Sequence, residues 1–400
     1  MYLIYDVLRL QKAALGYGIL VKRRDWNRIQ EDLRLLTPER IQDAITALSD
    51  HRAIPDATIH SLLQRLRSIG SHVPQSFTEK LIRRAEMKGL LIRLGMSEIW
   101  LTINPSDLTN PLVLILAGVP YSHESLPTST AAIRRLADII SNPVAVAQFF
   151  HHICEAFFTN LLRSDSGELG ILGDVSGHYG VVETNGRGMF HLHSLIWLRG
   201  NGTFDNLRHR VLNDSEFTQR LISFLESIIL NTVNEAVHDP EVSLFDQGIP
   251  SFPTDISDDE FYKQLLVDSH SVADKVQRHS QNHNATCFKY GKKDKCRFRM
   301  PRDLQPVSCA DDFGVIHLKR DDGWITSYNP AIATCIRSNH DITWIPTNVK
   351  ALSYIYYLTN YATKADVSPH QILVKAALIT DSMKSINSDQ SIIRHRTHGK

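Results

Sequence analysis

The segment from His178 to Leu198 is the feature that most constrains how this chain can fold. It contains two runs rich in β-forming residues, HYGVVET and MFHLHSLIWL, separated by the sequence Asn-Gly-Arg-Gly. An Asn-Gly pair between two such runs is a strong signal for a β-hairpin, because both residues tolerate the backbone angles of a tight turn. We therefore predict an antiparallel hairpin over these residues.

The second strand of this hairpin carries two histidines, His191 and His193, at alternate positions. Alternate side chains of a strand share a face, so both imidazoles point the same way and can chelate one divalent cation. Glu183, across the turn on the first strand, is a candidate third ligand because cross-strand neighbours lie close together. The simpler interpretation is a half-buried strand with two histidines facing solvent.

A second group of candidate residues lies in the sequence ALSYIYYLTNYATK, residues 351–364. If this sequence is helical, Tyr357, Tyr361 and Lys364 share one face, because they are spaced by four and three residues. A phenol becomes a useful nucleophile when a metal polarises the electrophile and a cation stabilises the phenolate. The alternative interpretation is an aromatic core stripe, since Tyr354 continues the same spacing.

A third group is a set of zinc-type ligands within residues 263–305, namely His279, His283, Cys287 and Cys296. Two thiolates and two imidazoles can close a tetrahedral structural zinc site. The first three ligands would share a helix face if this stretch were helical. The alternative interpretation is four unconnected polar residues.

The formal net charge of the chain, +1, conceals two segments of opposite sign. Residues 239–260 contain seven acidic residues and no lysine or arginine, whereas residues 275–302 contain nine cations and one aspartate, a net charge of +8. A chain-wide basic coat for nucleic acid is excluded, but the second segment is a local basic patch. Its aromatic residues, Phe288, Tyr290 and Phe298, can stack on bases or form the small core of a zinc-binding segment.

The remaining sequence predicts a mixture of helices and strands. Apolar spacing and capping residues predict helices within 22–95, from Pro143 onward and within 206–237, with caps at Thr37, Asp56, Ser76 and Asn142. Short runs rich in β-forming residues predict strands at Ser97–Asn104, Leu112–Ala117 and 341–345.

Four motifs follow one another in a recognisable order. They are WLTINPSDL (100–108), GVVETNGRGMFHLHSLIWL (180–198), TCFKYGKKDKCRFRMPR (286–302) and YYLTNYATK (356–364). Together they resemble the Rep-type catalytic domain of Helitron rolling-circle transposases, members of the HUH endonuclease superfamily. Asn185 stands where that family usually has glutamine.

The resemblance implies an α+β fold: a central antiparallel sheet of five strands with the two histidines on a central strand, flanking helices, a helical N-terminal region and a small zinc-binding insertion. The implied segments are a helical N-terminal region (1–95), a first part of the catalytic domain (96–238), an acidic linker (239–262), a basic zinc-binding segment (263–305), a second part of the catalytic domain with the tyrosine helix (306–366), and a C-terminal tail (367–400).

The resemblance also implies metal-dependent nicking and strand transfer on single-stranded DNA. His191 and His193, with Glu183, would hold one Mg or Mn ion, and Tyr357 or Tyr361 would form a phosphotyrosine while Lys364 stabilises charge. The zinc would be structural. The residues expected to contact DNA are Arg187, Lys289, Lys292, Lys293, Arg297 and Arg299.

Other functions remain open from the sequence. A non-catalytic DNA-binding remnant of a Helitron element would keep the basic patch while its active site decays. A histidine-triad nucleotide hydrolase would need a third alternating histidine, but position 195 is Leu195. A cupin metal site would need a chain rich in short strands, and this chain is mostly helical outside one sheet.

The complete family member carries a helicase after this domain, and residues 367–400 contain no helicase motif. We therefore expect a truncated chain that retains the nicking residues without the unwinding domain. The sequence shows no signal peptide and no apolar run of the ~18 residues that span a bilayer. The resemblance implies a nuclear location.

Overall fold

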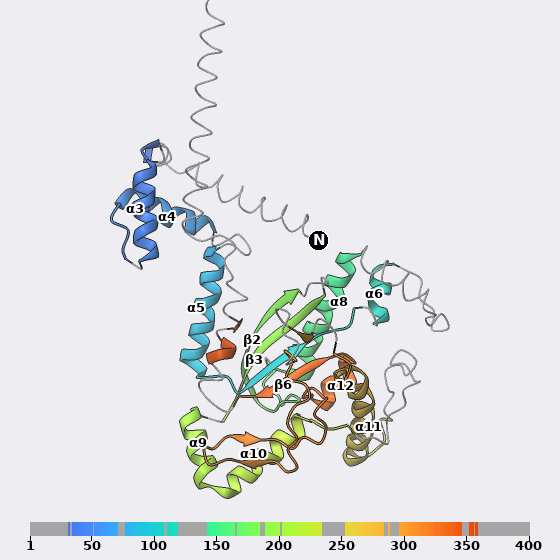
Figure 1. The fold of residues 1–400 in the computed structure, drawn as a ribbon. Helices are drawn as coiled ribbons and strands as arrows, with labels where there is room; N and C mark the ends of the chain where they lie inside the picture. Colours follow the sequence, from blue (N-terminus) through green and yellow to red (C-terminus); the bar gives the residue numbers. More distant parts are fainter. Residues whose placement is uncertain are drawn as a thin grey trace, which may run out of the picture. The chain divides into compact units, whose positions relative to one another are not determined.

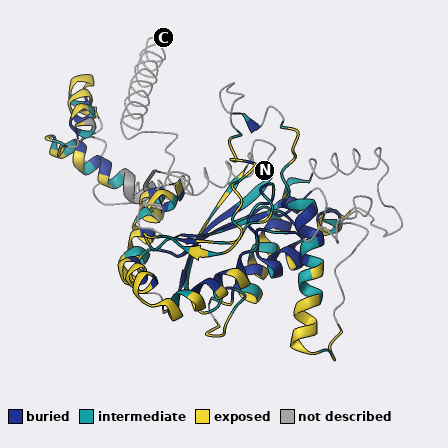
Figure 2. Cartoon of the chain, turned by 60° about the horizontal axis from the view of Figure 1, so that its bottom comes forward, coloured by how far each residue is buried: buried dark blue, intermediate teal, exposed yellow. Residues whose placement is uncertain are grey.

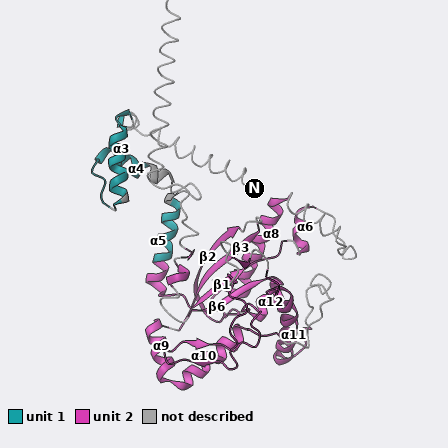
Figure 3. Ribbon diagram, viewed as in Figure 1, with its two compact units in different colours: residues 1–88, 359–400 teal, residues 89–358 magenta. Residues whose placement is uncertain are grey.

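The computed structural model of the chain describes residues 31–32, 34–50, 52–70, 77–107, 110–118, 142–164, 166–184, 189–200, 202–233, 253–283, 287–288, 296–345, 352–355 and 357–358. The chain divides into two compact units, which are residues 1–88 with 359–400 and residues 89–358 (Figure 1 and Figure 3). Each unit is described by itself below.

The first unit contains the helices predicted within residues 22–95. They are α3 (Pro38–Ser49), α4 (Ala57–Gly70) and the first part of α5 (Phe77–Leu94). The predicted caps are confirmed at Thr37, whose hydroxyl accepts from the Arg40 amide, and at Asp56, whose carboxylate accepts from the amides that begin α4. The predicted cap Ser76 lies outside the described residues. The apolar faces of α3 and α4 meet in a core of Leu36, Ile41, Ala44, Ile59, Leu62 and Leu63.

The second unit is built on an antiparallel sheet of four strands in the order β2-β3-β1-β6. The strands are β1 (Ile99–Ile103), β2 (Val175–Thr184), β3 (Phe190–Leu198) and β6 (His340–Trp344). The predicted hairpin is confirmed, because β2 pairs with β3 from Val175–Leu198 to Thr184–Phe190. The turn at 185–188 lies outside the described residues. β3 is buried from Leu192 to Leu198, as expected for an inner strand (Figure 2).

One face of this sheet is covered by helices. Phe190 of β3 packs on Phe150 with ring centroids 5.3 Å apart, and His178 of β2 stacks on Phe158 at 4.2 Å. These partners belong to α8 (Pro143–Ala156), predicted from its Asn-Pro start, and to the π-helical turn η1 (Phe157–Leu162) that continues it. The opposite face, which carries His191 and His193, is therefore turned away from α8.

The strand predicted at Leu112–Ala117 is wrong, because these residues form helix α6 (Pro111–Leu116). Asn110 caps it by accepting from the Leu112 amide at 3.0 Å, and the proline occupies the first turn. A cap followed by proline is a helix start, and this signal outweighs an apolar run of strand length. Within α6, Val113 and Leu114 are buried against Val146 and Phe149 of α8.

The remaining elements of the second unit follow β3 in the chain. They are α9 (Phe204–Asn213), α10 (Ser215–Ile228), α11 (Asp258–Val276), the hairpin β4 (Cys309–Ala310) with β5 (Ile316–His317), and α12 (Pro330–Ile336). The helix predicted within 206–237 is two helices, and the second ends at Ile228. The acidic residues of 258–260, at the end of the expected linker, form the first turn of α11 after the cap Ser257. Carboxylates at this end of a helix interact favourably with the helix dipole.

These elements confirm an α+β fold with a central antiparallel sheet and flanking helices. The sheet has four strands among the described residues, where the resemblance implied five. Strands predicted near Ser97–Asn104 and at 341–345 are confirmed as β1 and β6. Within the described part of the chain, no helix is both long and apolar enough to cross a membrane.

Candidate functional site

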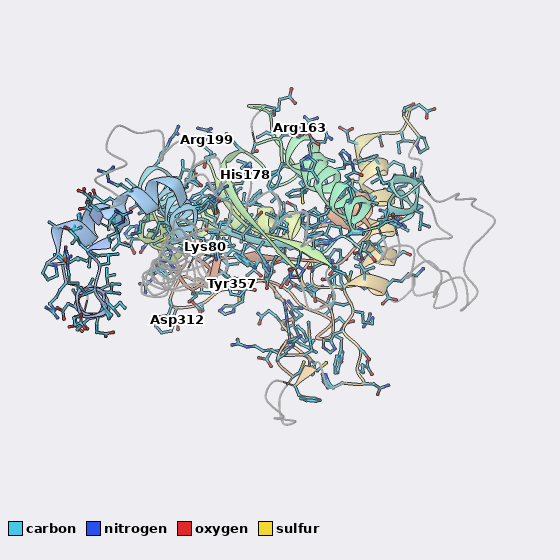
Figure 4. The ribbon with its side chains drawn as sticks, turned by 90° about the horizontal axis from the view of Figure 1, so that it is seen from above. Lys80, Arg163, His178, Arg199, Asp312 and Tyr357 are labelled. Carbon is cyan, nitrogen blue, oxygen red and sulfur yellow. The ribbon has the colours of Figure 1, made fainter. Side chains whose placement is uncertain are left out.

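Strand β3 presents His191 and His193 on the face of the sheet opposite Leu192. The register of the hairpin places Glu183 of β2 directly across from His191. The three predicted side chains therefore share one face, because directly paired residues in a sheet point the same way. Figure 4 labels two residues on the two sides of this sheet, His178 on the side of η1 and Tyr357 on the histidine side.

The three side chains converge on one carboxylate oxygen. Nε2 of His193 lies 3.2 Å from Oε2 of Glu183, and Nε2 of His191 lies 3.8 Å from the same oxygen. One nitrogen or oxygen from each residue lies within 4.8 Å of the other two. This arrangement contradicts the interpretation of two histidines facing solvent, because His193 is buried and His191 is half-buried.

Burial keeps both imidazoles neutral near neutral pH. Desolvation lowers the pKa of His191, and desolvation together with the nearby His191 lowers the pKa of His193 to about 4. A protonated imidazole has no lone pair for a metal, whereas a neutral one offers one nitrogen. The pair is therefore in the protonation state that metal coordination needs.

Strand β1 holds the His193 ring from the other side. The Thr102 hydroxyl lies 2.9 Å from Nδ1 of His193, its register partner. The indole of Trp100 stacks on the same imidazole, with centroids 5.4 Å apart and planes at 20°. Neither Thr102 nor Trp100 was among the site residues predicted from the sequence, although their alternate spacing in WLTIN predicts a shared strand face. The register that brings this face to His193 could not be read from the sequence.

Tyr357 lies beside His193. Its ring is 5.4 Å from the His193 ring and 5.7 Å from the Trp100 ring, edge-on to both. Tyr357 is 36% exposed. Within the predicted helix 351–364, the structure describes residues 352–355 and 357–358, and these are helical. Tyr361 and Lys364 lie outside the described residues.

Tyr354 differs from Tyr357 in its surroundings. Its ring stacks flat on Trp100 at 4.7 Å, and burial raises the pKa of its phenol. Tyr354 therefore belongs to the packing of the helix against the sheet. Tyr354 thus packs as the aromatic-stripe interpretation predicts, whereas Tyr357 is partly exposed and its role as a nucleophile stays a prediction.

The four predicted zinc ligands meet in a second site. Nε2 of His279 lies 3.6 Å from Sγ of Cys287 and 3.7 Å from Sγ of Cys296. Tetrahedral zinc with Zn–S of ~2.3 Å and Zn–N of ~2.0 Å separates such atoms by about 3.6 Å. Nδ1 of His283 is buried and has no hydrogen-bond partner among the described residues. These distances and this buried nitrogen suit a bound cation.

The spacing of these ligands does not come from a helix. α11 ends at Val276, and His279 and His283 lie in irregular chain beyond it, so the condition for a shared helix face is not met. The backbone is instead tied to neighbouring segments, with the His279 amide donating to the Trp324 carbonyl and the Arg297 amide to the Cys287 carbonyl, each at 2.8 Å. Trp324, Phe288 and Phe298 pack around the two histidines.

A chain of hydrogen-bonded amide side chains, of which Gln277 is buried, joins this second site to the sheet. Gln277, two residues before His279, accepts from Asn339 Nδ2 at 2.7 Å and lies 2.8 Å from Nδ1 of His340. Asn104, which directly follows β1, donates to Asn339 Oδ1 at 2.8 Å. The Asn-Pro of the first motif therefore has a packing role that the sequence did not reveal.

The predicted DNA-contacting residues are only partly described. Arg297 and Arg299 are exposed, and the Arg297 guanidinium lies over the Phe298 ring at 4.5 Å. The other four, Arg187, Lys289, Lys292 and Lys293, lie outside the described residues.

Comparison with known proteins gives one result for the N-terminal half of the chain. No curated protein matches the sequence. A family model matches residues 7–196, a range that includes Glu183, His191 and His193 and ends before Cys287, Cys296 and the tyrosine helix. Residues 7–196 match the family model of the Helitron helicase-like domain at the N-terminus.

Proposed function

We propose that this chain nicks single-stranded DNA and transfers the cut strand through a phosphotyrosine, as a Rep-type domain of a Helitron transposase would. The observation that carries the proposal is the contact between Tyr357 and His193. Their rings are 5.4 Å apart, and His193 is one of three metal-type ligands that converge on the same sheet face. A nucleophile, a cation site and a partly exposed position for substrate thus coincide.

The cation site in this proposal is formed by Glu183, His191 and His193. Two imidazole nitrogens and one carboxylate oxygen within 4.8 Å can hold one divalent cation, with open positions left for substrate oxygens. The resemblance implies Mg or Mn, and of these two the imidazole ligands favour the transition-metal ion, Mn. When bound, the ion would polarise the scissile phosphate and offset its charge. The neutral histidines have the protonation state that this binding needs.

Tyr357 is the proposed first nucleophile. Its phenolic oxygen forms a bond to phosphorus, and the bond from phosphorus to the 3′-oxygen of the preceding nucleotide breaks. The phenol loses its proton and the 3′-oxygen takes one up, so a 5′-phosphotyrosine and a free 3′-hydroxyl result. Nearby Trp100 restricts the ring, which favours a productive orientation.

The remaining roles follow the family resemblance. Tyr361 would serve a second strand transfer, and Lys364 would stabilise charge near the nucleophile. Zinc held by His279, His283, Cys287 and Cys296 would fix the basic segment. Five cations of that segment, together with Arg187 of the hairpin turn, would contact phosphates; the five are Lys289, Lys292, Lys293, Arg297 and Arg299.

A labelled single-stranded oligonucleotide, incubated with Mn and the full chain, tests this function. We expect a slower band on a denaturing gel that resists heat and detergent and disappears after protease treatment. The double variant Tyr357→Phe/Tyr361→Phe should form none of it. Tyr262→Phe is the matched control, because Tyr262 is similarly exposed but lies on α11.

Two outcomes would contradict the proposal. Absence of the band in the wild-type protein, with retained binding of the oligonucleotide, would favour a non-catalytic DNA-binding remnant. A band of equal intensity in the double variant would show that another residue makes the link.

A further inference from the structure

We propose that Thr102 is a positioning residue for His193. The Thr102 hydroxyl hydrogen-bonds to Nδ1 of His193 and so leaves Nε2 as the nitrogen that binds the metal. The inference deepens the proposed function, because it rests on the cation site at Glu183, His191 and His193. It concerns which nitrogen of one imidazole binds and how tightly, and it can be tested without DNA cleavage.

The geometry separates the two nitrogens of His193. Nδ1 lies 2.9 Å from the Thr102 hydroxyl, and Nε2 lies 3.2 Å from the Glu183 carboxylate. The two partners come from the two strands on either side of β3, since Thr102 and Val181 are its register partners on β1 and β2. Only Nε2 therefore points toward the other two ligands.

A hydroxyl suits this position because it can donate or accept. Without a metal, Nε2 carries the proton and donates to Glu183, while Thr102 donates to Nδ1. When a cation takes the Nε2 lone pair, the proton must reside on Nδ1, and the same hydroxyl then accepts from it. Valine at position 102 would leave Nδ1–H without this acceptor in a buried place.

Trp100 supports the same orientation by a separate contact. Its indole lies nearly parallel to the imidazole, and both side chains are buried, with 6% and 8% exposed. A ring held by stacking on one strand and by hydrogen bonds at both nitrogens has little freedom to rotate. Partners of a metal-bound histidine typically change metal affinity by 10–100-fold when they are removed.

The test measures Mn affinity of the full chain by electron paramagnetic resonance of free Mn, with protein that was first loaded with one equivalent of zinc to fill the cysteine site and then freed of unbound zinc, since free zinc would compete for the imidazoles. We expect Thr102→Val to weaken Mn binding by about 10-fold or more, and Thr102→Ser to restore it to within about 3-fold of the wild-type protein. Valine favours β-strands, so the fold should persist. Thr102→Ala is the second hydroxyl-free variant and should weaken binding as well.

Thr218→Val is the matched control, because that hydroxyl donates only to backbone carbonyls around the start of α10. It should leave Mn affinity unchanged. Equal affinity of Thr102→Val and the wild-type protein would overturn the inference, as would a wild-type chain whose Mn binding is unaffected by His193→Ala. Failure of DNA nicking alone would count against the proposed function and not against this assignment.

Discussion

At the scale of single residues, the site depends on histidines that burial holds neutral. His193 and His340 both have a pKa lowered to about 4 by desolvation, and they lie on opposite faces of the sheet. His193 lies at the candidate site, whereas His340 is fully buried and accepts from the Asn329 amide at 2.9 Å. Desolvation thus keeps His193 neutral at the candidate site and keeps His340 neutral in the packed interior.

This burial predicts an acid sensitivity that can be measured. The unfolded chain protonates a histidine near pH 6.5, but folded His340 resists protonation until about pH 4. Between these values the unfolded state binds more protons, so the free energy of unfolding should fall as the pH is lowered. The limiting slope is about 1.4 kcal/mol per pH unit for each such group.

Urea unfolding between pH 7 and pH 4.5 measures this slope. We expect His340→Gln to lose the part of the pH dependence of unfolding free energy that one titrating group contributes. His209→Gln should keep the full dependence, because His209 is exposed on α9. An identical pH dependence in His340→Gln and the wild-type protein would contradict the assignment of this group.

At the scale of elements, strand alternation was the most reliable guide from sequence to structure. The hairpin, the shared face of His191 and His193, and the cross-strand place of Glu183 were all predicted, because a strand has a fixed period of two. The α6 error arose where a short apolar run has no decisive period, and the Asn110-Pro111 start was the better signal. The contacts of Thr102 and Trp100 depend on strand register, which is a long-range property.

The start of α12 offers a test of element stability. Asn329 accepts from the Ile332 amide as a helix cap, and its amide also donates to the buried Ile228 carbonyl at 2.9 Å. Asn329→Ala removes both bonds, so we expect a loss of about 2–4 kcal/mol in the free energy of unfolding. Asn110→Ala, which removes only an exposed cap, should cost about 1 kcal/mol.

Chemical denaturation of the two variants beside the wild-type protein gives this comparison. If the two alanine variants lose equal stability, the buried hydrogen bond of Asn329 contributes little and the argument is wrong.

At the scale of the whole molecule, the near-neutral total charge is a sum that includes an acidic and a basic segment with different structural positions. The acidic residues of 258–260 begin a helix, whereas Arg297 and Arg299 are exposed next to the zinc-type ligand Cys296. Sequence identified the four ligand residues correctly as neighbours. The sequence could not predict how the backbone around His279 is held, because this depends on hydrogen bonds to distant segments such as Trp324.

Zinc content provides a prediction for this loop. The purified chain should hold about one zinc after Mn and Mg are stripped, because four ligand side chains meet at distances that suit one ion. Cys296→Ser should lose it and lower the thermal unfolding midpoint, while Cys309→Ser, at an exposed free cysteine, should retain it. Elemental analysis that finds no zinc in the wild-type protein would contradict the site.

The basic segment, residues 263–305, also leads us to expect a salt effect on DNA binding. If Arg297 and Arg299 each contact a phosphate, Arg297→Ala/Arg299→Ala should lower the slope of log affinity against log salt by about 1.4 for single strands. Arg220→Ala is the control, because exposed Arg220 pairs with Glu216 on α10, away from the basic segment in the sequence. Fluorescence anisotropy of a labelled oligonucleotide at several salt concentrations gives the slopes, and an unchanged slope in the double variant would exclude these contacts.

The central claim is that Tyr357 forms a covalent bond to DNA at the site of His191, His193 and Glu183. Trypsin releases residues 351–364 as one peptide, since lysines precede and end it. After reaction with single-stranded DNA and nuclease digestion, mass spectrometry of this peptide should show a nucleotide phosphate on Tyr357, or on Tyr361 in a Tyr357→Phe variant. A peptide 351–364 without any added nucleotide, from protein that binds the DNA and the metal, would contradict the account.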